Sequence, residues 1–102
     1  MNNYTINIKN NQDLNIDQLI ISGELSFNYI DAIYNDISSL LKKNIPEEII
    51  IENPDILDLS FIQILLSIKK EFQSKIILNL NEELTDLIKV AGFYKSLTDN
   101  KL

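Results

Sequence analysis

The sequence predicts an α/β domain in which a mixed sheet of about four strands carries helices mainly on one face. Three patterns support this fold class. Apolar residues alternate with polar ones from Tyr4 to Lys9, three isoleucines follow one another at positions 49–51, and apolar residues recur with helical spacing from Phe61 to Phe72. A period of two indicates a strand, and a period near 3.6 indicates a helix. Right-handed crossovers between parallel strands then place consecutive helices on the same side of the sheet.

The first half of the chain predicts a β-hairpin followed by a helix. Residues 4–9 form the expected edge strand, and the apolar run at residues 19–21 forms its partner. From Ser26, a residue type favoured at N-caps, apolar residues keep helical spacing until Asn44 and Pro46 end the helix. The residues that this spacing turns toward the core are Phe27, Ile30, Ile33, Tyr34, Ile37, Leu40 and Leu41.

A central strand and a second helix follow. Residues 48–52 contain three isoleucines without alternation, which predicts a strand in mid-sheet that is covered on both faces or nearly so. Asn53 and Pro54 turn the chain, and the helix begins at Asp58 or Leu59. Its expected core residues are Phe61, Ile64, Leu65, Ile68 and Phe72, and a second apolar stripe consists of Leu59, Ile62 and Leu66.

The last third of the chain predicts one more strand and one more helix. The apolar run at residues 76–80 indicates the strand. Asn81 caps the helix, acidic residues occupy its first turn, where the helix dipole favours them, and Gly92 follows its end. The expected buried stripe is Leu84, Leu87, Ile88 and Ala91. The predicted order is therefore ββαβαβα, in a single domain of residues 1–102.

Composition argues against several classes of function. The chain carries a formal net charge of −6, and all nine of its basic residues are lysines. Because nucleic acids bind clustered basic groups that release phosphate counterions, a nucleic-acid partner is not expected. The lack of His and Cys removes the common triads, redox dithiols and zinc sites, and the two glycines lie too far apart for a phosphate-binding loop. The acidic chain leaves an all-carboxylate site for Mg²⁺ or Ca²⁺ as an alternative, but it contains no Asp-x-Asp-x-Asp-Gly loop. We therefore expect no enzyme, no cofactor and no metal site.

The sequence also allows predictions of the cellular compartment and of the oligomeric state. Uncharged runs fall short of the about 20 residues that a membrane span needs, the start of the sequence lacks a secretory pattern, and no cysteine suggests an oxidising compartment. A cytoplasmic protein without direct membrane insertion is expected. Residues 4–9 form an edge guarded by little besides Lys9, which predicts a monomer or a weak homodimer.

Four stretches follow one another in a characteristic order and spacing. They are residues 20–25 ahead of the first helix, the strand at 49–51, the helix start at 58–66, and the last helix with its small-Gly-apolar ending at 81–93. Together they resemble the STAS domain family, the fold of bacterial anti-sigma-factor antagonists and of the cytoplasmic part of sulfate transporters. The resemblance covers almost the whole chain and implies a STAS-like sandwich.

The resemblance has its most direct consequence at the start of the second helix. The motif of the antagonists there is Asp-Ser-Ser/Thr-Gly-Leu/Met, whose first hydroxyl residue is phosphorylated by a partner kinase. This sequence has Asp58, Leu59, Ser60, Phe61 and Ile62 in those places. Asp58 and Ser60 match, whereas Leu59 has no hydroxyl to accept a phosphate. Ser60 is the remaining candidate for phosphorylation, and without it we expect constitutive partner binding.

The resemblance implies a non-enzymatic bacterial signalling module whose partner docks at the N-terminal end of the helix at residues 58–72. The expected partner is an anti-sigma factor, a histidine-kinase-like ATPase or another signalling protein, such as a chemotaxis component. The alternative is a small STAS accessory subunit of an ABC-type lipid transporter ATPase. The predicted partner-binding residues are Asp58, Leu59, Ser60, Ile62, Gln63 and Leu66.

These residues also have structural alternatives. An apolar group at a helix start with a polar rim suits a protein interface, but Ile62 and Leu66 equally suit packing against a neighbouring helix. Asp58 is a good N-cap in its own right. Leu59, nearest to the helix start, is the residue expected to be exposed.

Overall fold

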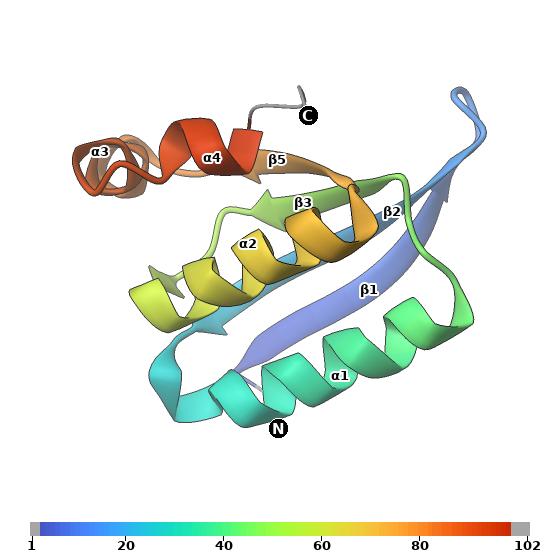
Figure 1. Ribbon diagram of the computed structural model, residues 1–102, viewed down its shortest axis with the longest axis horizontal. Helices are drawn as coiled ribbons and strands as arrows, with labels where there is room; N and C mark the ends of the chain where they lie inside the picture. Colours follow the sequence, from blue (N-terminus) through green and yellow to red (C-terminus); the bar gives the residue numbers. More distant parts are fainter. Residues whose placement is uncertain (1–2, 99–102) are drawn as a thin grey trace.

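The computed structural model describes residues 3–98 and confirms the α/β class (Figure 1). The structure adds a 3-10 turn and a two-residue strand to the elements expected from the sequence, and the last turn expected near Tyr94 and Leu97 is a short helix. In chain order the elements are β1 (Tyr4–Asn11), β2 (Ile16–Leu25), η1 (Phe27–Tyr29), α1 (Ile30–Lys43), β3 (Glu48–Glu52), β4 (Ile56–Leu57), α2 (Leu59–Phe72), β5 (Lys75–Asn79), α3 (Glu82–Val90) and α4 (Tyr94–Thr98).

The strands form one mixed sheet in the order β1-β2-β3-β5. β1 and β2 are an antiparallel hairpin, whereas β2, β3 and β5 run parallel to one another. The prediction of an edge strand at residues 4–9 and of a mid-sheet strand at 48–52 is thus confirmed. β4 pairs with the end of β2 in parallel. The sequence did not predict β4, because two residues are too few for a strand period.

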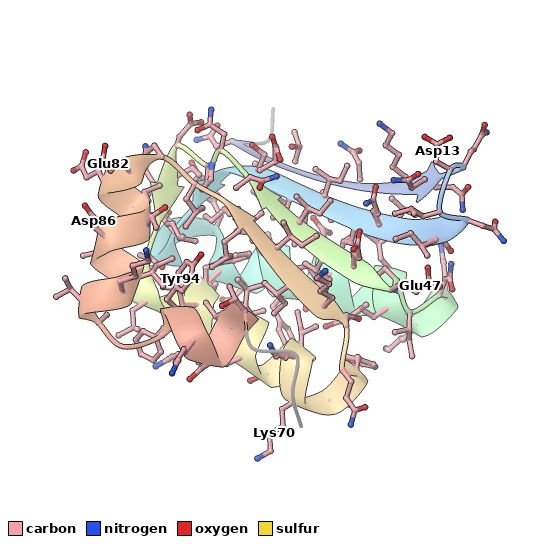
Figure 2. The ribbon with its side chains drawn as sticks, turned by 90° about the horizontal axis from the view of Figure 1, so that it is seen from above. Asp13, Glu47, Lys70, Glu82, Asp86 and Tyr94 are labelled. Atoms are coloured by element: carbon pink, nitrogen blue, oxygen red, sulfur yellow. The ribbon has the colours of Figure 1, made fainter. Side chains whose placement is uncertain are left out.

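The helices cover only one face of this sheet. In Figure 2 the helices α1, α2 and α4 lie below the strands, and α3 lies at one end. Burial alternates accordingly: Ile49 and Ile51 are fully buried, whereas Ile50 between them is half-buried. The expectation that this strand is covered on both faces or nearly so is therefore wrong for the described residues, because no described helix lies on the second face. Ile20 and Ile77 pair with Ile50 in register, so the three shield one another on the uncovered face.

The first helix buries a narrower stripe than its sequence predicts. Ile33, Ile37 and Leu41 are buried, as expected, but Phe27 and Tyr34 are exposed. Phe27 belongs to η1, where three residues complete a turn, so it no longer has the angular position that α-helical spacing assigned to it. Tyr34 lies at the border of the stripe.

The later helices begin where the sequence predicts, but α3 also buries a narrower stripe than expected. α2 begins after Asp58, as predicted, and α3 is capped by Asn81, whose side chain accepts the Leu84 amide at 2.8 Å. In α3 only Ile88 is buried, and Leu87 and Ala91 of the predicted stripe are exposed. Because α3 lies at the end of the sheet, a single narrow line of its surface is covered.

Candidate partner-docking surface at the start of helix α2

Two parallel strand ends bring two helix starts together. Leu25 at the end of β2 pairs with Leu57 at the end of β4, and the Asp58 amide donates to the Leu25 carbonyl at 3.1 Å. After these pairs, β2 leads through Ser26 into η1 and α1, while β4 leads directly into α2. The start of α2 therefore lies beside the turn that opens α1, although the two are distant in sequence.

The Asp58 carboxylate connects these two starts. Its Oδ1 accepts the Ser60 hydroxyl at 2.5 Å and the Phe61 amide at 3.4 Å, and its Oδ2 accepts the Phe27 amide at 2.6 Å. Ser26, the cap expected for the first helix, makes no capping bond and donates its hydroxyl to Glu24 at 2.9 Å instead. The structural role of Asp58 as an N-cap is therefore confirmed, and it extends to a second helix.

The hydrogen bonds also determine the charge of this carboxyl group. Burial raises the pKa of Asp58, but the Ser60 hydroxyl and three backbone amides together outweigh burial and hold the pKa below its ordinary value of 3.8. The amides are those of Phe27, Phe61 and Ser60. Asp58 is thus ionised at neutral pH, at the point where the partial positive charges of two helix starts meet.

Two residues next to this carboxylate have large, exposed apolar side chains. Leu59, the next residue in the chain, is 52% exposed, and Phe27, whose amide binds Asp58, is 73% exposed. Ser60 is half-buried, and Gln63, one turn further along α2, is exposed. We refer to Phe27, Leu59, Ser60 and Gln63, together with Asp58, as the docking surface.

The structure divides the predicted partner-binding residues. Leu59 is exposed, as expected, and Ser60 and Gln63 lie beside it on the first turns of α2. Ile62 is only 5% exposed and belongs to the hydrophobic core, so it is not part of the docking surface. Leu66 is half-buried and packs against the same core.

Phe27 is the residue that sequence reasoning assigned to the wrong environment. Helical spacing placed it in the core, but it belongs to η1, the first turn after the end of β2 and ahead of α1. Its position directly after a strand was the one feature of the sequence that could have indicated exposure. The contact with Asp58 could not be predicted, because it depends on the pairing of β2 with β4.

Metal clusters, membrane spans and lysine positions within residues 3–98 bear on other kinds of site. In this range, no three acidic side chains gather closely enough to hold a metal ion. None of the helices described is both long enough and apolar enough to cross a membrane. Lysine side chains lie mainly at the helix ends, with Lys42 and Lys43 closing α1 and Lys69 and Lys70 in the last turn of α2.

Comparison with protein-family models finds no match for this chain, and comparison with curated proteins finds none either. The resemblance to the STAS family therefore stays a prediction from the sequence.

Proposed function

We propose that the chain is a non-enzymatic, STAS-type interaction module of a bacterial signalling system, whose protein partner docks on the start of α2. The observation that carries this proposal is the exposure of two large apolar side chains next to Asp58: Leu59 follows it in the chain, and the Phe27 amide is hydrogen-bonded to its carboxylate. The two residues belong to segments that are distant in sequence, and the hydrogen bond from the Phe27 amide to Asp58 connects these segments in the folded protein.

The chemistry of the docking surface is that of a small protein interface. Aromatic and aliphatic side chains at the centre of an interface contribute most of the binding energy, and a polar rim supports them. Phe27 and Leu59 supply the apolar centre, and Ser60 and Gln63 supply polar groups beside it. Because one carboxylate caps both helix starts, the backbone under the surface is already ordered, so less conformational entropy is lost on binding.

The same geometry favours binding without a phosphorylation switch. Leu59 occupies the place of the family's phosphoacceptor, and the Ser60 hydroxyl already donates to Asp58. A phosphate on Ser60 would place about two negative charges against an ionised carboxylate. Modification of Ser60 would therefore disrupt the cap of α2, which makes the unmodified protein the binding-competent form.

Affinity capture from the native cells tests the proposal. The tagged wild-type protein is compared with Leu59→Glu and with Leu14→Glu, an identical substitution at an exposed leucine between β1 and β2. A negative charge in the first turn of α2 is compatible with the helix dipole, so Leu59→Glu should fold normally. We expect a partner that is retained by Leu14→Glu and lost by Leu59→Glu.

The identity of that partner separates the two roles. A sigma regulator or a histidine-kinase-like ATPase among the lost proteins supports signalling, whereas a transporter ATPase supports the accessory-subunit alternative. If both variants capture the same proteins as the wild type, the proposal that the partner binds at the docking surface is wrong. A Phe27→Ala variant, which keeps the backbone amide bound to Asp58, should weaken the same interaction.

A further inference from the structure

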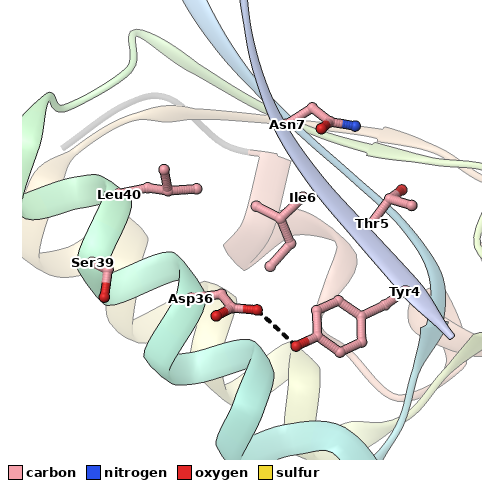
Figure 3. A pocket seen from close by; sticks show the side chains of 7 residues that line it. All are labelled: Tyr4, Thr5, Ile6, Asn7, Asp36, Ser39 and Leu40. Atoms are coloured by element: carbon pink, nitrogen blue, oxygen red, sulfur yellow. Dashed lines mark hydrogen bonds between the residues drawn. The ribbon is translucent and has the colours of Figure 1, made fainter. Parts of the chain in front are cut away.

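The outer edge of β1 faces a groove that neither the core nor the docking surface uses. Within the described residues, β1 pairs only with β2, so its second edge is open. Helix α1 runs alongside this edge, and a groove of about 570 Å³ lies between the two elements (Figure 3). The residues that line the groove are Tyr4, Thr5, Ile6, Asn7, Asp36, Ser39 and Leu40.

The register of the hairpin shows which backbone groups face the groove. The Glu24 amide donates to the Asn3 carbonyl at 2.8 Å, and the antiparallel register pairs Tyr4 with Gly23. In an antiparallel pair, hydrogen-bonded and non-hydrogen-bonded positions alternate. The backbone groups of Thr5, Asn7 and Lys9 are therefore directed at β2. Those directed away from β2 belong to Tyr4, Ile6, Ile8 and Asn10.

The side chains give the groove an apolar centre and one charged end. Figure 3 shows Ile6 of β1 and Leu40 of α1 projecting into the space between the two elements. At one end, the Tyr4 hydroxyl donates to Asp36 Oδ2 at 2.7 Å, which ties β1 to α1. Beyond the other end, Ile8 continues the same side of β1 and is 41% exposed.

We propose that this groove binds an extended peptide segment, which adds to the sheet as a strand along β1. Strand addition obtains affinity from main-chain hydrogen bonds and specificity from alternate side chains. The peptide's alternate apolar side chains would pack against Ile6, Leu40 and Ile8. Among the described residues that line the groove, Asp36 alone is formally charged, and the chain as a whole is acidic, so a Lys or Arg in the peptide pairs with Asp36.

A single strand fits this site better than a second copy of the chain. In Figure 1, α1 lies along β1 on the side away from β2 and so projects past the edge of the sheet. Joining two copies through their β1 strands would bring a second α1 to the same edge and the same face. A peptide without an attached helix avoids this conflict.

Two substitutions at one residue test the backbone part of the proposal. Ile8→Pro removes an outward amide donor without touching the ladder to β2, and proline is tolerated at such edge positions. Ile8→Ala keeps that amide and removes the side chain. Random heptapeptides displayed on phage are selected against the wild-type protein, and synthetic copies of the enriched peptides are titrated with each variant.

We expect enriched peptides with alternating apolar residues and one basic residue. Their affinity should fall about tenfold in Ile8→Pro and less in Ile8→Ala, as expected for one lost hydrogen bond. Asp36→Asn, which still accepts the Tyr4 hydroxyl, should weaken binding by about threefold and remove the preference for the basic residue. Leu59→Glu should leave peptide affinity unchanged, since the proposal does not depend on the docking surface.

Amide hydrogen exchange of the wild-type protein provides a readout that needs no variant. A bound peptide should protect the amides of Ile6 and Ile8, whereas those of Thr5 and Asn7 are already bonded to β2 and should change little. Failure to enrich any peptide, or enriched peptides that bind Ile8→Pro as well as the wild type, would overturn the proposal. Protection of the Ile6 and Ile8 amides that rises with protein concentration alone would assign the edge to self-association instead.

Discussion

Asp58 connects two helix starts through one side chain. One carboxylate oxygen accepts groups from the first turn of α2, and the other accepts the amide that opens η1. An N-cap ordinarily satisfies amides of one helix. Here the same residue also fixes the position of α1 relative to α2, so its removal should affect more than local helix stability.

Asp58→Ala should lower the free energy of unfolding by about 2 kcal/mol at pH 7, which is the upper end of the range for N-caps. The reason is that amides at two helix starts lose their acceptor. Equilibrium urea unfolding measures the change, and Asp55→Ala, at an exposed aspartate of the preceding turn, is the matched control. A loss no larger than that of the control would contradict the double cap.

The cost of Asp58→Ala should depend on pH in a defined direction. The folded pKa of Asp58 lies below the ordinary value of 3.8, so the ionised form is favoured in the folded state. The stabilisation is therefore present above the unfolded pKa and is lost as pH falls through the folded pKa. The difference between wild type and Asp58→Ala should shrink when unfolding is repeated in acid, and a constant difference would exclude the carboxylate charge as the cause.

The residues of the candidate site differ in how far the sequence could predict them. Asp58 and Leu59 were predictable, because an N-cap and its neighbour follow from residue type and helical spacing alone. Phe27 was not, since its exposure depends on η1 and on a contact between segments that are 31 residues apart. Ile62 shares a helix face with Leu59 and Leu66, and only the packing of neighbouring elements shows that it is buried.

At the scale of elements, β3 shows where a sequence pattern loses information. Strand type and mid-sheet position followed from the run of isoleucines, and both are confirmed. Isoleucine fits both on a sheet face that helices cover and on a sheet face where neighbouring isoleucines shield it from solvent. The run therefore did not distinguish a strand covered on both faces from one covered on a single face, whereas helix caps at Asp58 and Asn81 were correct because their chemistry is local.

Alanine substitutions at adjacent positions of β3 should differ in cost. Ile51→Ala removes a fully buried side chain from beneath the helices and should lower the free energy of unfolding by about 3 kcal/mol, within the range for large cavities. Ile50→Ala, on the uncovered face, should cost about 1 kcal/mol because water can fill the space left. Thermal or urea unfolding of the pair measures the difference. Equal costs would mean that the second face of β3 is covered in solution.

At the scale of the whole molecule, one hydrophobic cluster joins the elements. Its buried residues come from β1 to β5, from α1 and α2, and from the two short helices near the C-terminal end of the described chain. The contributions are unequal: α2 supplies Phe61, Ile62, Leu65 and Ile68, whereas α3 supplies only Ile88. The sequence predicted a buried stripe of several residues on each helix, because spacing records which residues are apolar and not how much of a helix the sheet can cover.

A single shared core predicts that the chain unfolds as one cooperative unit. Urea transitions followed by tyrosine fluorescence and by far-UV circular dichroism should coincide, and two separate transitions would show that the chain contains more than one folding unit.

Native-state hydrogen exchange should then rank the helices by stability, because elements with few buried contacts open below the global free energy of unfolding. The amides of α3 should exchange through local opening, and those of α2 only through global unfolding. Equal protection of both helices would contradict this order, and would mean that the exposed Leu87 and Val90 of α3 are covered in solution by a contact that one isolated chain does not make.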